Sequence, residues 1–127
     1  MKDKRPVNLD LGTIRLPLAA YTSILHRISG VIVFIGIAIL LWLFDLSLGS
    51  EDGFNTIRQT LDSFMARLVL WGILSALAYH LVAGIRHLLM DMGIADGKAS
   101  GTNSARLVVV VGILLILVLG GWLWPAV

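Results

Sequence analysis

The sequence contains no cysteine and has few charged residues. The lack of cysteine excludes disulfide bonds, thiolate metal sites and thiol nucleophiles. Charged residues make up 14% of the 127 residues, whereas hydrophobic residues make up 57%. Soluble domains carry roughly 25% charged residues. A chain with so few charges cannot cover a water-facing surface, so we expect lipid to be the solvent for much of it.

The net charge is small and positive, at +2, with an isoelectric point near 9.4 and a mean hydropathy of +0.89. In a membrane protein such an excess of basic residues is first an indicator of topology. It does not indicate a nucleic-acid partner, and we predict none. The length suits one domain, which we assign to residues 1–127.

Three long apolar segments are each predicted to form a membrane-spanning helix, at about 23–48, 64–90 and 105–125. A span needs about 20 apolar residues in a helix. Backbone groups cannot stay unpaired in hydrocarbon, and the alternating pattern of barrel strands is missing from these segments. The sequence therefore predicts an all-α membrane protein of three transmembrane helices, with two connecting loops and an N-terminal surface segment at 1–22.

Basic residues are unevenly distributed between the two ends of the predicted spans. At the first loop there are two, Arg58 within the loop and Arg67 just inside the second span. Eight lie in the N-terminal segment or around the second loop: Lys2, Lys4, Arg5, Arg15, Arg27, Arg86, Lys98 and Arg106. Positive residues favour the cytoplasmic side. We therefore predict a cytoplasmic N-terminus and a C-terminus on the opposite side.

His80 lies deep inside the second predicted span. Ionisable residues at such depth are costly and often mark function, and imidazole is a protein ligand of haem iron. The alternative is a histidine that hydrogen-bonds to a neighbouring helix. Gly72, Ala76 and Gly84 share its helix face, so a macrocycle or a partner helix could approach closely. His87 is about 10 Å further along the helix, so one haem could not take both histidines as axial ligands.

Ser23, His26 and Arg27 lie within one turn at the start of the first span. A hydroxyl and a cation at the membrane interface suit a quinone carbonyl, and His26 with Arg27 suits carboxylates such as haem propionates. The alternative is an ordinary helix start with an arginine that reaches to the lipid headgroups. Because the chain has one deep histidine, a haem with two histidine ligands would need the second from another chain.

Two ordered motifs resemble the cytochrome b556 subunit family of bacterial succinate dehydrogenase. The first is Ser23-x-x-His26-Arg27-x-Ser29-Gly30, and the second is the stretch 78–91, AYHLVAGIRHLLMD. The N-terminal stretch 5–11, RPVNLDL, matches the enterobacterial form of the family. The resemblance covers nearly the whole chain, although hydropathy alone agrees in the first loop and the third span.

The resemblance implies a role for each matching residue. His80 falls on the axial ligand of haem b, whose other ligand comes from a second membrane-anchor subunit. Ser23 and Arg27 fall on the ubiquinone pocket, while His26 and Arg27 fall near the haem propionates. The implied fold is a helical bundle with that partner anchor in the bacterial inner membrane.

The same resemblance implies that this chain is a non-catalytic anchor in an oxidoreductase complex. The implied partners are a flavoprotein subunit, which carries the succinate chemistry, an iron–sulfur subunit and membrane lipid. Two alternatives remain open. One is an anchor of the fumarate reductase type that uses menaquinone, and the other is a three-helix membrane scaffold without redox function.

Overall fold

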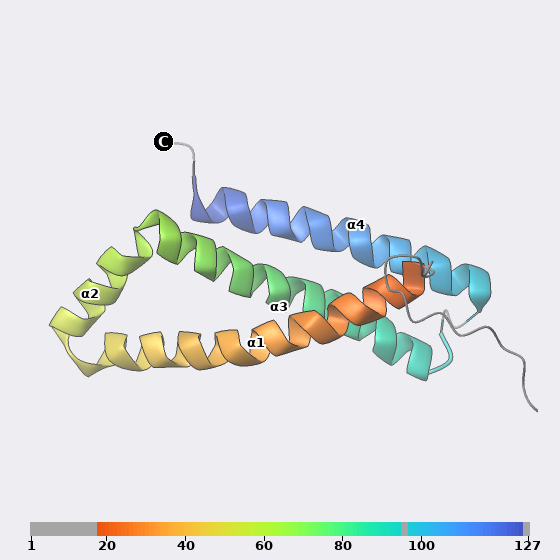
Figure 1. The fold of residues 1–127 in the computed structure, drawn as a ribbon, viewed down its shortest axis with the longest axis horizontal. Helices are drawn as coiled ribbons and strands as arrows, with labels where there is room; N and C mark the ends of the chain where they lie inside the picture. Colours follow the sequence, from red (N-terminus) through yellow and green to blue (C-terminus); the bar gives the residue numbers. More distant parts are fainter. Residues whose placement is uncertain (1–17, 95–96, 126–127) are drawn as a thin grey trace, which may run out of the picture.

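The computed structural model describes residues 18–94 and 97–125, which form four helices (Figure 1). They are α1 (Leu18–Gly49), α2 (Glu51–Leu61), α3 (Phe64–Asp91) and α4 (Lys98–Leu123). Three of them, α1, α3 and α4, are long and apolar enough to cross a membrane. The predicted all-α fold with three spans is confirmed. Most of the predicted N-terminal surface segment lies outside the described residues, and residues 18–22 form the start of α1.

The long helices are apolar on nearly all sides, so their surfaces suit lipid or partner helices and not water. Within the described residues, the buried hydrophobic side chains are few: Val33, Ile73, Ala83, Ala105 and Val108. Large apolar side chains are instead exposed along the spans, and Phe34 in the middle of α1 is 81% exposed. The internal core of this chain is therefore small, and much of its apolar surface is left for the membrane environment.

Helix α3 packs against both α1 and α4, and α1 crosses α3 so that the start of α1 lies beside α4 (Figure 1). Several side-chain hydrogen bonds to main-chain carbonyls join the helices, and two of them come from aromatic residues of α3. The Tyr79 hydroxyl donates to the carbonyl of Thr22 in α1 over 2.9 Å, and the Trp71 indole N–H donates to Ile116 in α4 over 2.9 Å. In hydrocarbon these polar atoms have no water to pair with, so the bonds fix how the helices dock.

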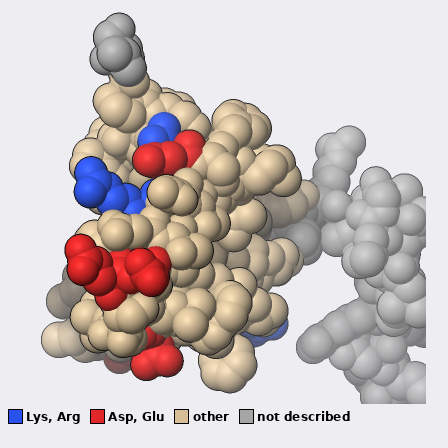
Figure 2. Space-filling view, turned by 90° about the vertical axis from the view of Figure 1, so that its left-hand side faces the viewer, with Lys and Arg blue, Asp and Glu red and all other residues tan. Residues whose placement is uncertain are grey.

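Helix α2 occupies the region that the sequence predicted as the first loop. Ser50 caps it, since its hydroxyl accepts the N–H of Gly53 over 2.9 Å. Glu51 and Asp52 in the first turn and Arg58 in the last turn oppose the charges of the helix dipole. The charged side chains of this end of the molecule gather over α2 and its flanks (Figure 2). The cap and the charged end turns therefore stabilise a helix in this connection, which is too polar to span a membrane.

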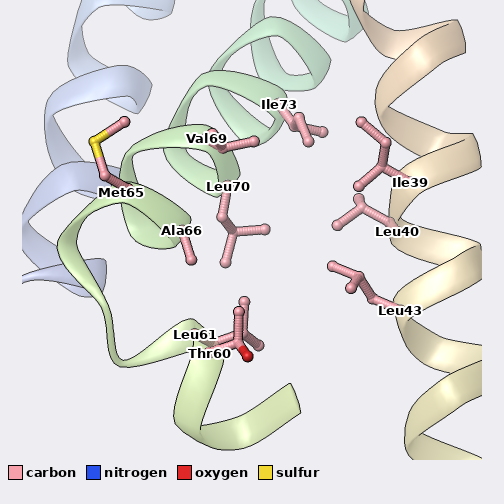
Figure 3. Close-up of a pocket in the computed structure, with 10 residues that line it drawn as sticks. All are labelled: Ile39, Leu40, Leu43, Thr60, Leu61, Met65, Ala66, Val69, Leu70 and Ile73. Atoms are coloured by element: carbon pink, nitrogen blue, oxygen red, sulfur yellow. The ribbon is translucent and has the colours of Figure 1, made fainter. Parts of the chain in front are cut away.

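α2 bridges α1 and α3 where these two helices diverge (Figure 1). Apolar side chains from all three helices face a cavity of about 250 Å³ in this wedge (Figure 3). The lining includes Ile39 and Leu43 from α1, Leu61 from α2, and Val69 and Ile73 from α3. Beyond this wedge α1 and α3 pack against each other, with close approaches at Gly36 beside Ile73 and at Gly30 beside His80.

Helix α4 begins at Lys98, earlier than the predicted start at about 105. Arg86 of α3 explains part of the difference. Its side chain is only 6% exposed and donates to the Ser104 hydroxyl over 3.0 Å and to the Gly101 carbonyl over 3.2 Å. Gly101 is buried as well, so small residues in the first turns of α4 pack closely on α3. This tertiary contact stabilises helical structure in residues 98–104, which the sequence predicted as part of the second loop.

Candidate functional site

The three histidines of the chain gather between α1 and α3. The rings of His26 and His80 stack almost in parallel, with centroids 4.3 Å apart and 4° between their planes. The His87 ring is tilted by 43° against the His26 ring, at a centroid distance of 4.9 Å. His26 thus contacts both histidines of α3. The sequence placed His80 and His87 on one face, but it did not predict that His26 would lie beside them.

The ring of His80 is held by α1 through one nitrogen. Nδ1 of His80 lies 3.2 Å from the main-chain carbonyl oxygen of His26 and 3.2 Å from the Ser29 hydroxyl. A carbonyl oxygen can only accept, so Nδ1 carries the proton and donates it. A neutral imidazole with its proton on Nδ1 keeps the lone pair on Nε2. Nε2 makes no hydrogen bond within the described residues, so it is the nitrogen available to a ligand.

Two glycines allow the helices to approach closely at these rings. A Cβ atom on Gly30 of α1 would lie 3.0 Å from Cε1 of His80, which is tighter than an ordinary contact. A Cβ atom on Gly84 of α3 would lie 3.3 Å from Nε2 of His26. Gly84 belongs to the small-residue face predicted around His80. Gly72 on the same face has no atom of another part of the chain within 4 Å of such a Cβ.

The histidines border an open groove of about 340 Å³ on the surface of α1 and α3. Besides the three imidazoles, its lining is apolar or glycine: Leu81, Gly84, Ile85 and Leu88. Leu81 and Leu88 are 61% and 64% exposed, so the described residues leave this side of α3 uncovered. Within the described residues, no set of three or more His, Asp or Glu side chains converges as a bare metal ion would require.

Ser23 and Arg27 lie on α1 one turn apart, next to the histidine cluster in sequence. Ser23 is half-buried and Arg27 is exposed. Neither side chain forms a hydrogen bond or ion pair within the part of the chain that the structure describes. Among the described residues, both polar groups are thus without a partner on the same helix end. The structure brings His26 and His80 into contact, whereas the guanidinium of Arg27 forms no hydrogen bond with either of them.

Arg86 has a role in the structure that the sequence did not predict. The sequence analysis counts it among the basic residues around the second loop, whereas its side chain is buried and joins α3 to α4. The signal that could have revealed this is the run of small and polar residues at 100–104, which offers acceptors and room for a guanidinium. Arg86 contributes to packing near the site, and its hydrogen bonds within the described residues go to α4 and not to the histidine rings.

These features define an all-helical, multi-pass membrane protein with a polar, histidine-containing site between two of its spans. Residues 1–120 match the family described as succinate dehydrogenase/fumarate reductase transmembrane subunit. The chain belongs to this family.

Several curated relatives are similar over most of the chain. The succinate dehydrogenase cytochrome b556 subunit of Coxiella burnetii is 40% identical over 125 residues, which cover 98% of this chain and all of the relative. The subunits of the same name from Paracoccus denitrificans and Rickettsia felis are 38% and 34% identical, and the matches cover 72% and 92% of this chain and 71% and 91% of the relatives. With three apolar helices and bacterial relatives, this chain is a multi-pass protein of the bacterial inner membrane.

Proposed function

We propose that this chain is the membrane-anchor subunit of a succinate dehydrogenase, that His80 is an axial ligand of a b-type haem, and that Ser23 and Arg27 line part of the ubiquinone site. The name shared by the relatives, cytochrome b556, supports a b-type haem. The observation that carries the proposal is the state of His80. Its Nδ1–H is engaged by α1, while Nε2 keeps its lone pair beside an apolar groove.

The residues around His80 fit a haem. A metal-bound histidine usually donates its other N–H to a carbonyl or similar acceptor, which fixes the ring and its tautomer. His80 already has this arrangement through the carbonyl of His26. Haem supplies one-electron redox chemistry when bound, and its potential depends on the axial ligand and on burial. The chain's own contribution is to orient one imidazole and to provide an apolar wall for the macrocycle.

His26 and Arg27 are the groups proposed to contact the haem propionates. Arg27 is permanently charged and exposed, and it has no acidic partner within the described residues. A guanidinium binds a carboxylate through two parallel N–H donors, which suits a propionate at the membrane surface. His26 is adjacent in sequence, and its ring lies against His80.

Ser23 and Arg27 are proposed to hold ubiquinone at the cytoplasmic end of α1. The Ser23 hydroxyl can donate a hydrogen bond to a quinone oxygen. The Arg27 guanidinium stabilises the negative charge that develops on that oxygen as electrons arrive, which is an electrostatic role. No succinate chemistry is assigned to this chain, and electrons are expected to reach the quinone from the iron–sulfur and flavoprotein subunits.

A second membrane-anchor subunit is proposed to complete the haem site. The groove beside His80 is open, and the exposed leucines on its rim leave one side for another chain. Since the three histidine rings are stacked or tilted against one another and do not converge, a second axial histidine is assigned to that partner. Together the two anchors would form a helical bundle around the macrocycle.

The test is purification of the complex in mild detergent, followed by a reduced-minus-oxidised absorption spectrum and mass spectrometry of the co-purifying chains and the extracted quinone. The proposal expects a b-type haem band, a second small membrane chain, a flavoprotein, an iron–sulfur protein and ubiquinone. A complex without a haem band would instead support a non-redox scaffold. Menaquinone in place of ubiquinone would support a fumarate reductase anchor, which the family description also includes.

A further inference from the structure

Ser29 and Gly30 belong to the first sequence motif but have no role in the proposed function so far. Ser29 is 5% exposed, and its hydroxyl donates to the His26 carbonyl over 2.7 Å. The oxygen of the Ser29 hydroxyl also lies 3.2 Å from Nδ1 of His80, which is 51 positions further along the chain. Gly30 lies next to the ring, where a Cβ would be 3.0 Å from Cε1. Both residues therefore contact the imidazole of His80.

The directions of these hydrogen bonds follow from the groups involved. A serine hydroxyl has one proton, and Ser29 gives it to the His26 carbonyl. Its oxygen is then left to accept, and the Nδ1–H of His80 is the donor within reach. One N–H is thus shared between two acceptors from a single turn of α1, the His26 carbonyl and the Ser29 hydroxyl. Two acceptors restrict rotation of the ring more than one acceptor does.

We propose that Ser29 is a positioning residue for the haem ligand: its hydroxyl accepts the Nδ1–H of His80, fixes the plane of the imidazole and makes Nε2 a stronger donor to iron. Gly30 permits this contact because it leaves room for the ring. The inference rests on the proposed ligation of haem by His80. Loss of such outer contacts usually lowers metal affinity by roughly 10- to 100-fold.

The test compares Ser29→Ala with Ser29→Thr in the assembled complex. Ser29→Ala removes the acceptor, whereas Ser29→Thr keeps a hydroxyl and adds a methyl group. The methyl has space to occupy, because Ser29 also borders an open apolar groove of about 330 Å³ with Ile28, Gly72 and Tyr79. The measurements are haem content, the low-spin electron paramagnetic resonance signature and the midpoint potential of the haem.

For Ser29→Ala we expect haem retention to fall by roughly 10- to 100-fold, the low-spin signature to shift, and the midpoint potential to rise. The potential rises because a less basic imidazole stabilises ferric iron less. Ser29→Thr should keep the parental signature and potential. If the two variants behave alike in these measurements, whether both are normal or both defective, the hydroxyl is not the positioning group and the inference is wrong.

His80→Leu, prepared in parallel, separates this inference from the proposed function. If His80→Leu loses or alters the haem while Ser29→Ala and Ser29→Thr behave alike, His80 remains the ligand and only the role of Ser29 is overturned. If the haem spectrum survives unchanged in His80→Leu, the proposed ligand is wrong, and the role of Ser29 fails with it.

Discussion

The imidazole rings of His26 and His80 lie face to face, with centroids 4.3 Å apart and planes within 4° of each other. The main chain of the same His26 holds Nδ1 of His80. A single residue of α1 therefore supports His80 twice, through its carbonyl and through its ring. The stack covers one face of the His80 ring, and Nε2 makes no hydrogen bond within the described residues.

The close contact of α1 and α3 at Gly36 can be tested by overpacking. A Cβ on Gly36 would lie 2.6 Å from Cγ2 of Ile73, which is buried. Gly36→Ala should therefore force the helices apart and destabilise the protein by about 1–3 kcal/mol. Thermal denaturation of the purified complex measures the change.

Gly121→Ala in α4 is the matched control, since a Cβ there has nothing within 4 Å. It should leave the denaturation temperature nearly unchanged. Equal effects of the two substitutions would show that the packing of α1 on α3 is not as tight as described.

Arg27 is the residue on which the quinone assignment depends most. Removing a group that stabilises developing charge commonly lowers turnover by about 100-fold or more. Arg27→Ala should lower ubiquinone reduction to this extent, and Ser23→Ala should lower it less, while succinate oxidation with an artificial dye and haem content persist. Arg27→Lys should also be impaired, because an ammonium group lacks the planar fork of the guanidinium.

Arg58→Ala provides the control for Arg27→Ala. Arg58 is also an exposed arginine, but it lies in α2, far along the chain from Ser23 and Arg27. It should reduce ubiquinone at the parental rate. Parental rates in both Arg27→Ala and Ser23→Ala would remove these residues from the quinone site.

The orientation in the membrane follows from the distribution of basic residues and can be measured directly. The N-terminus and the connection between α3 and α4 should face the cytoplasm, and α2 should face the opposite side. We therefore expect activity from a reporter that works only outside the cytoplasm when it is fused after residue 127. Activity of a cytoplasm-dependent reporter at the same position would contradict the predicted orientation.

The sequence predicted the three spans well because their signal is bulk hydropathy, which does not depend on tertiary contacts. The bounds of α3, Phe64–Asp91, differ from the predicted 64–90 by a single residue. The first loop was wrongly predicted as non-helical. Its helix α2 is short and polar, and its formation depends on the Ser50 cap and the charges of its end turns.

The candidate site was only partly predictable. The spacing of Ser23, His26 and Arg27 placed them together on one helix end, since such neighbours are fixed by helix geometry. The stacking of His26 on His80 depends instead on how α1 crosses α3, which the sequence pattern does not specify. The same holds for Arg86, whose acceptors lie on α4.

The central claim is that His80 binds haem iron, and the most direct measurement is the haem spectrum of His80→Leu in the assembled complex. The account predicts that the low-spin b-type spectrum is lost, or that its spin state or midpoint potential changes if the partner's ligand retains the haem. His87→Leu should keep a low-spin spectrum, because His87 is about 10 Å along the helix from His80 and cannot share its axial role. An unchanged low-spin spectrum and midpoint potential in assembled His80→Leu complex would contradict the account and leave His80 as a packing residue.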